Sequence, residues 1–196
     1  PDLIGVATTC LSETIGDDIP QIIAKTTADG KIPQGKFVFH ANTPSYVGSH
    51  VTGFSNMVKA MVDYFATPSD KKEKCVNLIP GWVEPSDMKE IKQIAAEMGV
   101  NSILFPDTEN VLNGPQTGKF TMYPKGGVTI DQLKKTGSSR GTIALGRLAS
   151  EPAALVLDVE CLLTLRPHNP FDFLVEFFVG EVFVQHQGQE FVNLFV

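Results

Sequence analysis

The sequence predicts an α/β fold in which a parallel β-sheet is covered by helices on both faces. Short apolar stretches rich in β-branched residues alternate along the chain with longer segments that have helical periodicity. Strands separated by helices of this length form βαβ units, whose parallel sheets are buried on both faces. No internal repeat and no low-complexity segment interrupts the alternation.

The candidate strands are five short apolar stretches bounded by polar or turn-forming residues. Apolar runs of about four to eight residues with β-branched and aromatic side chains are typical of strands inside a sheet. In chain order they are Leu3–Thr8, Lys36–His40, Cys75–Pro80, Asn101–Phe105 and Thr142–Leu145.

Helices are predicted between these strands. Asp18 can cap a helix that runs to about Ala28. The clearest helix follows the second strand and ends before Pro68, because its apolar residues recur every three or four positions and share one face. These residues are Phe54, Met57, Val58, Met61, Val62 and Phe65.

Three further helices complete the alternation. Ser86 is the expected N-cap of a helix that Gly99 closes. Thr129 and Gln132 have the spacing of a capping box and predict a short helix. Ala149–Leu157 is the last predicted helix.

Two segments do not fit this alternation. Pro106–Val128 is a long loop rich in glycine and proline, and loops of this length are usually functional or pack against a partner. Seven of the 13 phenylalanines lie between Phe171 and Phe195, where neither helical nor strand periodicity is clear. We expect an α/β region at residues 1–161 and a divergent phenylalanine-rich tail of unassigned structure at residues 162–196.

Composition excludes several classes of function. The formal net charge of −6 disfavours binding to nucleic acid. No signal peptide and no apolar stretch long enough for a membrane span is visible. Three widely spaced cysteines do not predict a disulfide framework, which favours the cytoplasm. The chain begins at Pro1, directly before a strand, so we expect an internal fragment of a longer protein.

Common cofactor and hydrolase motifs do not account for the sequence. Gly114–Lys119 resembles a phosphate-binding loop, but its glycines are one residue too close and Phe120 stands where a Ser or Thr is needed. No G-x-G-x-x-G follows a strand, so no nucleotide is predicted in this chain. The zinc motif H-E-x-x-H, paired C-x-x-C and the hydrolase motif G-x-S-x-G are also missing from the sequence.

Two loops carry the residues that point to chemistry. Thr8–Asp18 and His40–Gly53 each follow a predicted strand and precede a predicted helix. In open parallel sheets, ligands gather at the carboxyl ends of the strands. If the first two strands are neighbours, Cys10 and Ser45 lie on the same edge, within reach of one ligand.

A cysteine in this position suits an iron–sulfur cluster. Thiolates bind iron, and backbone N–H groups at the start of a helix favour the thiolate and can bond to the cluster sulfurs. Other readings of the same residues stay open. Cys10 can be a small buried apolar residue, and Ser45 an ordinary turn residue. Cys75 begins an apolar strand and is expected in the core.

The two loops resemble the β subunit of nitrogenase, in the molybdenum–iron or vanadium–iron protein. The resemblance rests on TTCLSETIGDD at Thr8–Asp18 and TPSYVGSHVTG at Thr43–Gly53. It runs from Pro1 to about Cys161, and the tail beyond departs from the family pattern. Shorter segments that agree are Pro80–Gly81, Glu97–Val100, Gly118–Tyr123 and Gly126–Thr129.

The resemblance implies part of a Rossmann-like domain of the nitrogenase component 1 type, in an α2β2 assembly. In the family, an eight-iron, seven-sulfur P-cluster shared with the α subunit passes electrons from the Fe protein to the active-site cofactor during nitrogen fixation. Cys10 matches a cysteine ligand of that cluster. Ser45 matches the serine whose oxygen can join an iron when the cluster is oxidised. In the family, the β subunit helps to form the surface on which the Fe protein docks. The positions on that surface correspond to Glu13, Thr14 and Ile15 of this chain.

This chain departs from the family in what it lacks. Further cysteine ligands of the family's β subunit lie upstream of the region that matches Pro1, so the fragment alone is not expected to be an active nitrogenase. Two other interpretations stay open: a scaffold subunit for cofactor assembly, and an inactive α/β fragment without a cluster. The pairing of Cys10 with Ser45 favours the catalytic β subunit over the scaffold.

Overall fold

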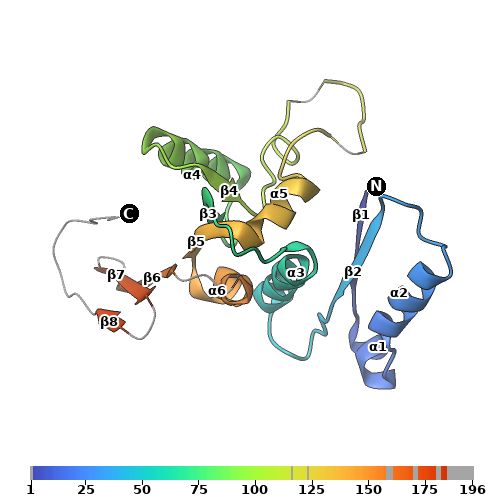
Figure 1. Cartoon of the computed structure of the whole chain (residues 1–196). Helices are drawn as coiled ribbons and strands as arrows, with labels where there is room; N and C mark the ends of the chain where they lie inside the picture. The colour runs from blue at the N-terminus through green and yellow to red at the C-terminus, as the bar shows by residue number, and fades with distance from the viewer. Residues whose placement is uncertain are drawn as a thin grey trace.

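The structure is a computed structural model that describes residues 2–157 apart from residues 116 and 123, together with residues 161–169, 172–179 and 182–184. The rest of the expected tail lies outside the described residues. In chain order the elements are β1 (Leu3–Ala7), α1 (Cys10–Ile15), α2 (Ile19–Ala28), β2 (Phe37–Ala41), α3 (His50–Phe65), β3 (Glu73–Ile79), α4 (Pro85–Glu97), β4 (Ser102–Leu104), α5 (Ile130–Lys135), the 3-10 turn η1 (Thr136–Ser138), β5 (Ser139–Leu145), α6 (Arg147–Val156), β6 (Cys161–Asn169), β7 (Asp172–Val179) and β8 (Val182–Val184) (Figure 1).

The strands form two sheets in the part of the chain that is described. β1 and β2 pair in parallel, with Leu3 opposite Phe37 and Ala7 opposite Ala41. The second sheet has the order β4-β3-β5-β6-β7-β8, parallel from β4 to β6 and antiparallel beyond. The expected α/β class is therefore confirmed. The strands β6, β7 and β8 fall in a region to which sequence periodicity assigned no structure.

Helix α3 lies between the two sheets, and α1 and α2 lie on the other side of β1 and β2 (Figure 1). Its predicted apolar face is confirmed: Val58, Val62 and Phe65 are buried with Phe39 of β2 and Ile79 of β3. Alternate residues of a strand point to opposite faces. Accordingly, Leu78, which precedes Ile79 in β3, packs on the opposite face of the sheet, under α4. It forms a second core with Met88, Ala95 and Leu104.

Most helix limits follow the sequence signals, and one expected cap is wrong. Asp18 caps α2 by accepting a hydrogen bond from the Gln21 N–H at 2.9 Å. Helix α4 begins earlier than expected, since its N-cap is Glu84 rather than Ser86. Pro85 occupies the first helical position, which suits its fixed φ and missing N–H. Among the described residues, no helix is both long and apolar enough to cross a membrane.

A buried polar network joins β3 to η1 and β5. The Asn77 side chain is 2% exposed; its Nδ2 donates to the Thr136 carbonyl at 2.9 Å and to Thr142 Oγ1 at 3.1 Å. Its Oδ1 accepts from Ser139 Oγ at 2.7 Å. Cys75 is buried at the edge of this network, with Sγ 3.2 Å from Ser139 Oγ, as expected for a core residue.

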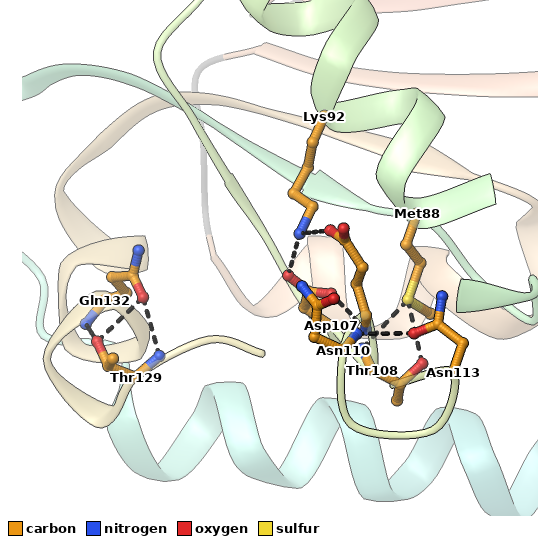
Figure 2. A network of polar contacts seen from close by, with 9 residues as sticks. Met88, Lys92, Asp107, Thr108, Asn110, Asn113, Thr129 and Gln132 are labelled. Atoms are coloured by element: carbon orange, nitrogen blue, oxygen red, sulfur yellow. Dashed lines mark hydrogen bonds and ion pairs between the residues drawn. The ribbon is translucent and has the colours of Figure 1, made fainter. Parts of the chain in front are cut away.

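The long loop at residues 106–128 is fixed at its base and projects from the domain between β4 and α5 (Figure 1). Lys92 of α4 bridges two carboxylates of the loop, Asp107 at 2.7 Å and Glu109 (Figure 2). Burial lowers the pKa of Lys92, but its bonds to these carboxylates outweigh that effect and raise it. At the other end of the loop, the predicted capping box of Thr129 and Gln132 is confirmed (Figure 2).

Candidate metal centre

Parallel pairing of β1 with β2 brings the two motif loops to one edge. The register ends with Ala7 opposite Ala41. The ladder continues for one more bond, because the Thr8 N–H donates to the Ala41 carbonyl at 3.1 Å. Parallel strands end at the same edge of a sheet, so the residues that follow both strands emerge side by side.

Cys10 and Ser45 meet at this edge. Cys10 Sγ lies 2.7 Å from Ser45 Oγ, and the Ser45 N–H donates to the same sulfur at 3.1 Å. Cys10 is half-buried and Ser45 is exposed, so their side chains remain accessible from outside the chain. The predicted juxtaposition is therefore confirmed across 35 positions of sequence.

The first loop contains a short helix that the sequence analysis did not predict. α1 begins at Cys10 and has Thr9 as its N-cap. The Thr9 N–H donates to Ser12 Oγ at 3.0 Å, and Ser12 N–H donates back to Thr9 Oγ1 at 3.4 Å. Gly16 ends the helix in the left-handed region at φ 78°, where glycine carries no steric cost. These contacts fix the backbone at Cys10.

The second loop holds Ser45 in a tight turn. The Val47 N–H donates to the Pro44 carbonyl at 3.2 Å, which closes a turn over Ser45 and Tyr46. The fixed φ of Pro44 restricts the backbone just before Ser45. Ser49 then caps α3, in a capping box with Thr52. The turn leaves the Ser45 N–H directed at the cysteine sulfur.

The pKa of the Cys10 thiol is lowered from its ordinary value. The largest cause is the hydrogen bond from the Ser45 hydroxyl, followed by the Ser45 backbone N–H; burial acts in the opposite direction. Both bonds favour the thiolate, which is the form that binds metals. In the folded chain this pairing adds stability at and above the ordinary thiol pKa. That contribution is lost as the pH falls through the lowered pKa.

We expect alkylation of Cys10 by iodoacetamide to persist at a lower pH than for an unperturbed thiol with a pKa of about 8.5. In Ser45→Ala, which removes the largest cause of the shift, the midpoint should move to higher pH. The rate is read for each cysteine peptide by mass spectrometry, and Cys75, which is 4% exposed, serves as the internal control for folding. Equal midpoints in the two chains would contradict this assignment.

The other predicted site residues follow Cys10 on α1. Glu13 is half-buried and accepts a hydrogen bond from the Thr8 hydroxyl at 2.5 Å. The Thr14 hydroxyl donates to the Cys10 carbonyl at 2.7 Å. Ile15 is 64% exposed and, with Leu11 at 69%, forms an apolar outer face of the helix. The bonds of Thr8 were not predicted, because they depend on how the two strands pair.

The donor set of the described residues is incomplete for a metal ion. No group of three or more His, Cys, Asp or Glu side chains is placed to hold one in that part of the chain. His50 starts α3 and stacks edge-on against Trp82, with ring centroids 5.5 Å apart. His40 lines a cavity of about 340 Å³ together with Thr8 and Asp17, and neither Cys10 nor Ser45 is among the residues that line it. A metal site at Cys10 and Ser45 therefore requires ligands from outside the described residues.

The fold and the site define an α/β protein with a thiol–hydroxyl pair at the carboxyl ends of parallel strands. A family model described as "Nitrogenase component 1 type Oxidoreductase" matches residues 1–174. The chain belongs to this family. The match extends past Cys161, where the resemblance seen in the sequence fades.

Curated relatives support the β-subunit resemblance. The nitrogenase molybdenum-iron protein beta chain of Clostridium pasteurianum is 52% identical over 166 residues, which are 85% of this chain and 36% of that protein. The beta chain of Azotobacter vinelandii is 40% identical over 151 residues, 74% of this chain and 29% of that protein. The chain thus spans about a third of the length of these relatives.

A solved structure titled "Nitrogenase Cp1 at pH 6.5" superposes with a TM-score of 0.81 at 51% sequence identity. The superposition covers 85% of this chain and 37% of that chain. The suspected nitrogenase β-subunit relationship is therefore confirmed at the level of both sequence and fold.

Proposed function

We propose that this chain is part of the β subunit of a nitrogenase dinitrogenase component, and that Cys10 and Ser45 supply ligands to its P-cluster. That cluster would be shared with the α subunit and would carry electrons from the Fe protein to the active-site cofactor. The observation that carries the proposal is the 2.7 Å contact between Cys10 Sγ and Ser45 Oγ at an open sheet edge. Similarity to molybdenum-iron protein beta chains supports the same reading.

The residues present fit one share of an iron–sulfur cluster. A thiolate is the usual protein ligand of such clusters, and the pKa of Cys10 is already shifted toward that form. The exposure of Ser45 lets a large group approach from outside the chain. Two donors are too few to enclose a cluster of this kind, which supports a site completed by another subunit and by further parts of this one.

Each of the two residues has a distinct chemical task in this proposal. A cluster bound here supplies reversible storage of electrons. Cys10 holds the site by its thiolate, which the Ser45 N–H orients at 3.1 Å. Ser45 carries a proton on Oγ that can leave when the cluster is oxidised. The negative charge that the cluster loses with the electron is then balanced by the negative charge left on the Ser45 oxygen.

The outer face of α1 is proposed to help form the surface on which the Fe protein docks. Ile15 and Thr14 are exposed on that face, next to the exposed Leu11. Glu13 belongs to the same helix, although its carboxylate turns inward to Thr8. Apolar residues exposed together on one helix are typical of an interaction surface.

The proposal is tested by measuring the potential of the cluster against pH in the complete assembly. If Ser45 releases a proton on oxidation, the midpoint potential should fall by about 59 mV per pH unit for one proton per electron. Ser45→Ala should remove this dependence, whereas Ser69→Ala, an exposed serine whose hydroxyl bonds only locally, should keep it.

Two outcomes would count against the proposal. An assembly that contains no iron would remove every cluster function, and the inactive fragment would then be the better description. If the midpoint potential depends on pH in the same way in wild type and in Ser45→Ala, a scaffold subunit would be favoured, in which the serine does not release a proton on oxidation.

A further inference from the structure

Thr8 lies at the base of both loops and is 8% exposed. Its Oγ1 donates to Glu13 Oε1 at 2.5 Å and accepts from the Thr43 N–H at 2.8 Å. A hydroxyl has a single proton, so the short bond to the carboxylate is its main donation, ahead of the Ala41 carbonyl at 3.4 Å. The hydroxyl thereby connects α1 to the start of the second loop.

A second bond closes this connection in the opposite direction. Thr43 Oγ1 donates to the Thr8 carbonyl at 2.9 Å. Each threonine thus bonds by its side chain to the backbone of the other. The charged carboxylate of Glu13 polarises the Thr8 hydroxyl, which makes its oxygen a better acceptor for Thr43. We call this arrangement of Thr8, Thr43 and Glu13 the threonine clasp.

The two threonines of the threonine clasp are each separated from a site residue by the same number of positions in the sequence. Cys10 follows Thr8 by two positions, and Ser45 follows Thr43 by two. The intervening residues have little freedom: Thr9 is locked as the N-cap of α1, and Pro44 has a fixed φ. A displacement of the clasp is therefore expected to move the sulfur and the hydroxyl oxygen.

We propose that Thr8 is a positioning residue, whose hydroxyl holds the Cys10 thiol and the Ser45 hydroxyl in contact by tying Glu13 to Thr43. Its role in electron transfer rests on the function proposed above, but the tie itself needs no bound cluster. Valine has the same shape as threonine without the hydroxyl. At position 8 it would leave the Thr43 N–H and the Glu13 carboxylate without their partner in a partly buried place.

The test measures how closely the two loops are held, in the absence of metal. In a Ser45→Cys version of the full chain, the disulfide between Cys10 and the introduced thiol is equilibrated against glutathione. The equilibrium constant reports the effective concentration of one thiol at the other. We expect Thr8→Val to lower this constant about tenfold, the worth of roughly one such buried bond. Thr8→Ser, which keeps the hydroxyl, should stay within about twofold of the parent.

Control variants separate positioning from general stability. Thr26→Val removes a hydroxyl that bonds within α2 and should leave the constant unchanged. Cys75 must resist alkylation in every chain, as a buried thiol does in the folded state. If Thr8→Val does not fold, Thr43→Val removes only the bond to the Thr8 carbonyl and should lower the constant by a smaller factor.

The outcomes distinguish this inference from the proposed function. An unchanged constant in folded Thr8→Val, or a loss that Thr8→Ser does not restore, would overturn the positioning role. A metal-free assembly would overturn the proposed function without affecting the disulfide measurement. A lowered constant in Thr8→Val and Thr43→Val, with Thr26→Val unchanged, supports the threonine clasp in either case.

Discussion

Replacing Cys10 with alanine in the complete α–β assembly is expected to lower the iron content of the proposed P-cluster and to reduce electron flow by about a hundredfold or more. The reason is that no other cysteine whose surroundings are described lies at this edge of the sheet. Cys75, the other cysteine whose surroundings are described, is 4% exposed in the core of the second sheet. Iron is measured by elemental analysis, and electron flow by substrate reduction with the Fe protein.

Cys75→Ala is the matched control for this experiment. It removes a thiol of the same size from the buried network next to Ser139, so it should reduce stability while leaving the cluster iron unchanged. If Cys10→Ala retains both wild-type iron content and wild-type turnover, the sulfur is not a ligand and the assignment of the site fails.

The second large effect is expected on stability. Asn77→Leu should lower the free energy of unfolding by about 3 kcal/mol, because Leu has a similar volume but satisfies none of the partners of the buried amide. The carbonyl of Thr136 and the hydroxyls of Ser139 and Thr142 would lose their hydrogen bonds to it.

Urea unfolding of the purified chain measures this change. Asn101→Leu is the control, since Asn101 is exposed and its substitution should change stability by about 0.5 kcal/mol at most. A loss below about 1 kcal/mol in Asn77→Leu would mean that the network is not an important part of the core.

Sequence patterns predicted the parts of the fold that depend on local periodicity. The apolar repeat from Phe54 to Phe65 identified α3 and its buried face, and the spacing of Thr129 and Gln132 identified the cap of α5. The sequence also predicted that Cys10 and Ser45 share one edge of the sheet if the first two strands are neighbours, and the parallel pairing of β1 with β2 meets that condition.

The remaining features depend on interactions that no local pattern carries. The partners of Asn77 lie 59 to 65 positions away, so nothing near it in sequence marks it as the centre of a network. Helix α1 was hidden inside a motif loop because its cap pairs Thr9 with Ser12, where the usual signature has Glu or Gln. The role of Thr8 required the register of β1 and β2, which only the structure supplies.

The incomplete donor set is consistent with the length of the chain. Cys10 and Ser45 are the two donors of the proposed site, and the chain spans about a third of the molybdenum-iron beta chains it resembles. A site that opens at the edge of a sheet can be completed by a second subunit, whereas a buried site cannot. The exposure of Ser45 and of the apolar residues on α1 is therefore part of the same proposal.

The most direct test of the central claim is a map of anomalous scattering at the iron edge, from crystals of the complete α–β assembly. We predict an iron peak at bonding distance from Cys10 Sγ, with further iron peaks of the same cluster extending toward the α subunit and Ser45 Oγ beside them. A map whose iron peaks all lie away from this edge of the sheet would contradict the account.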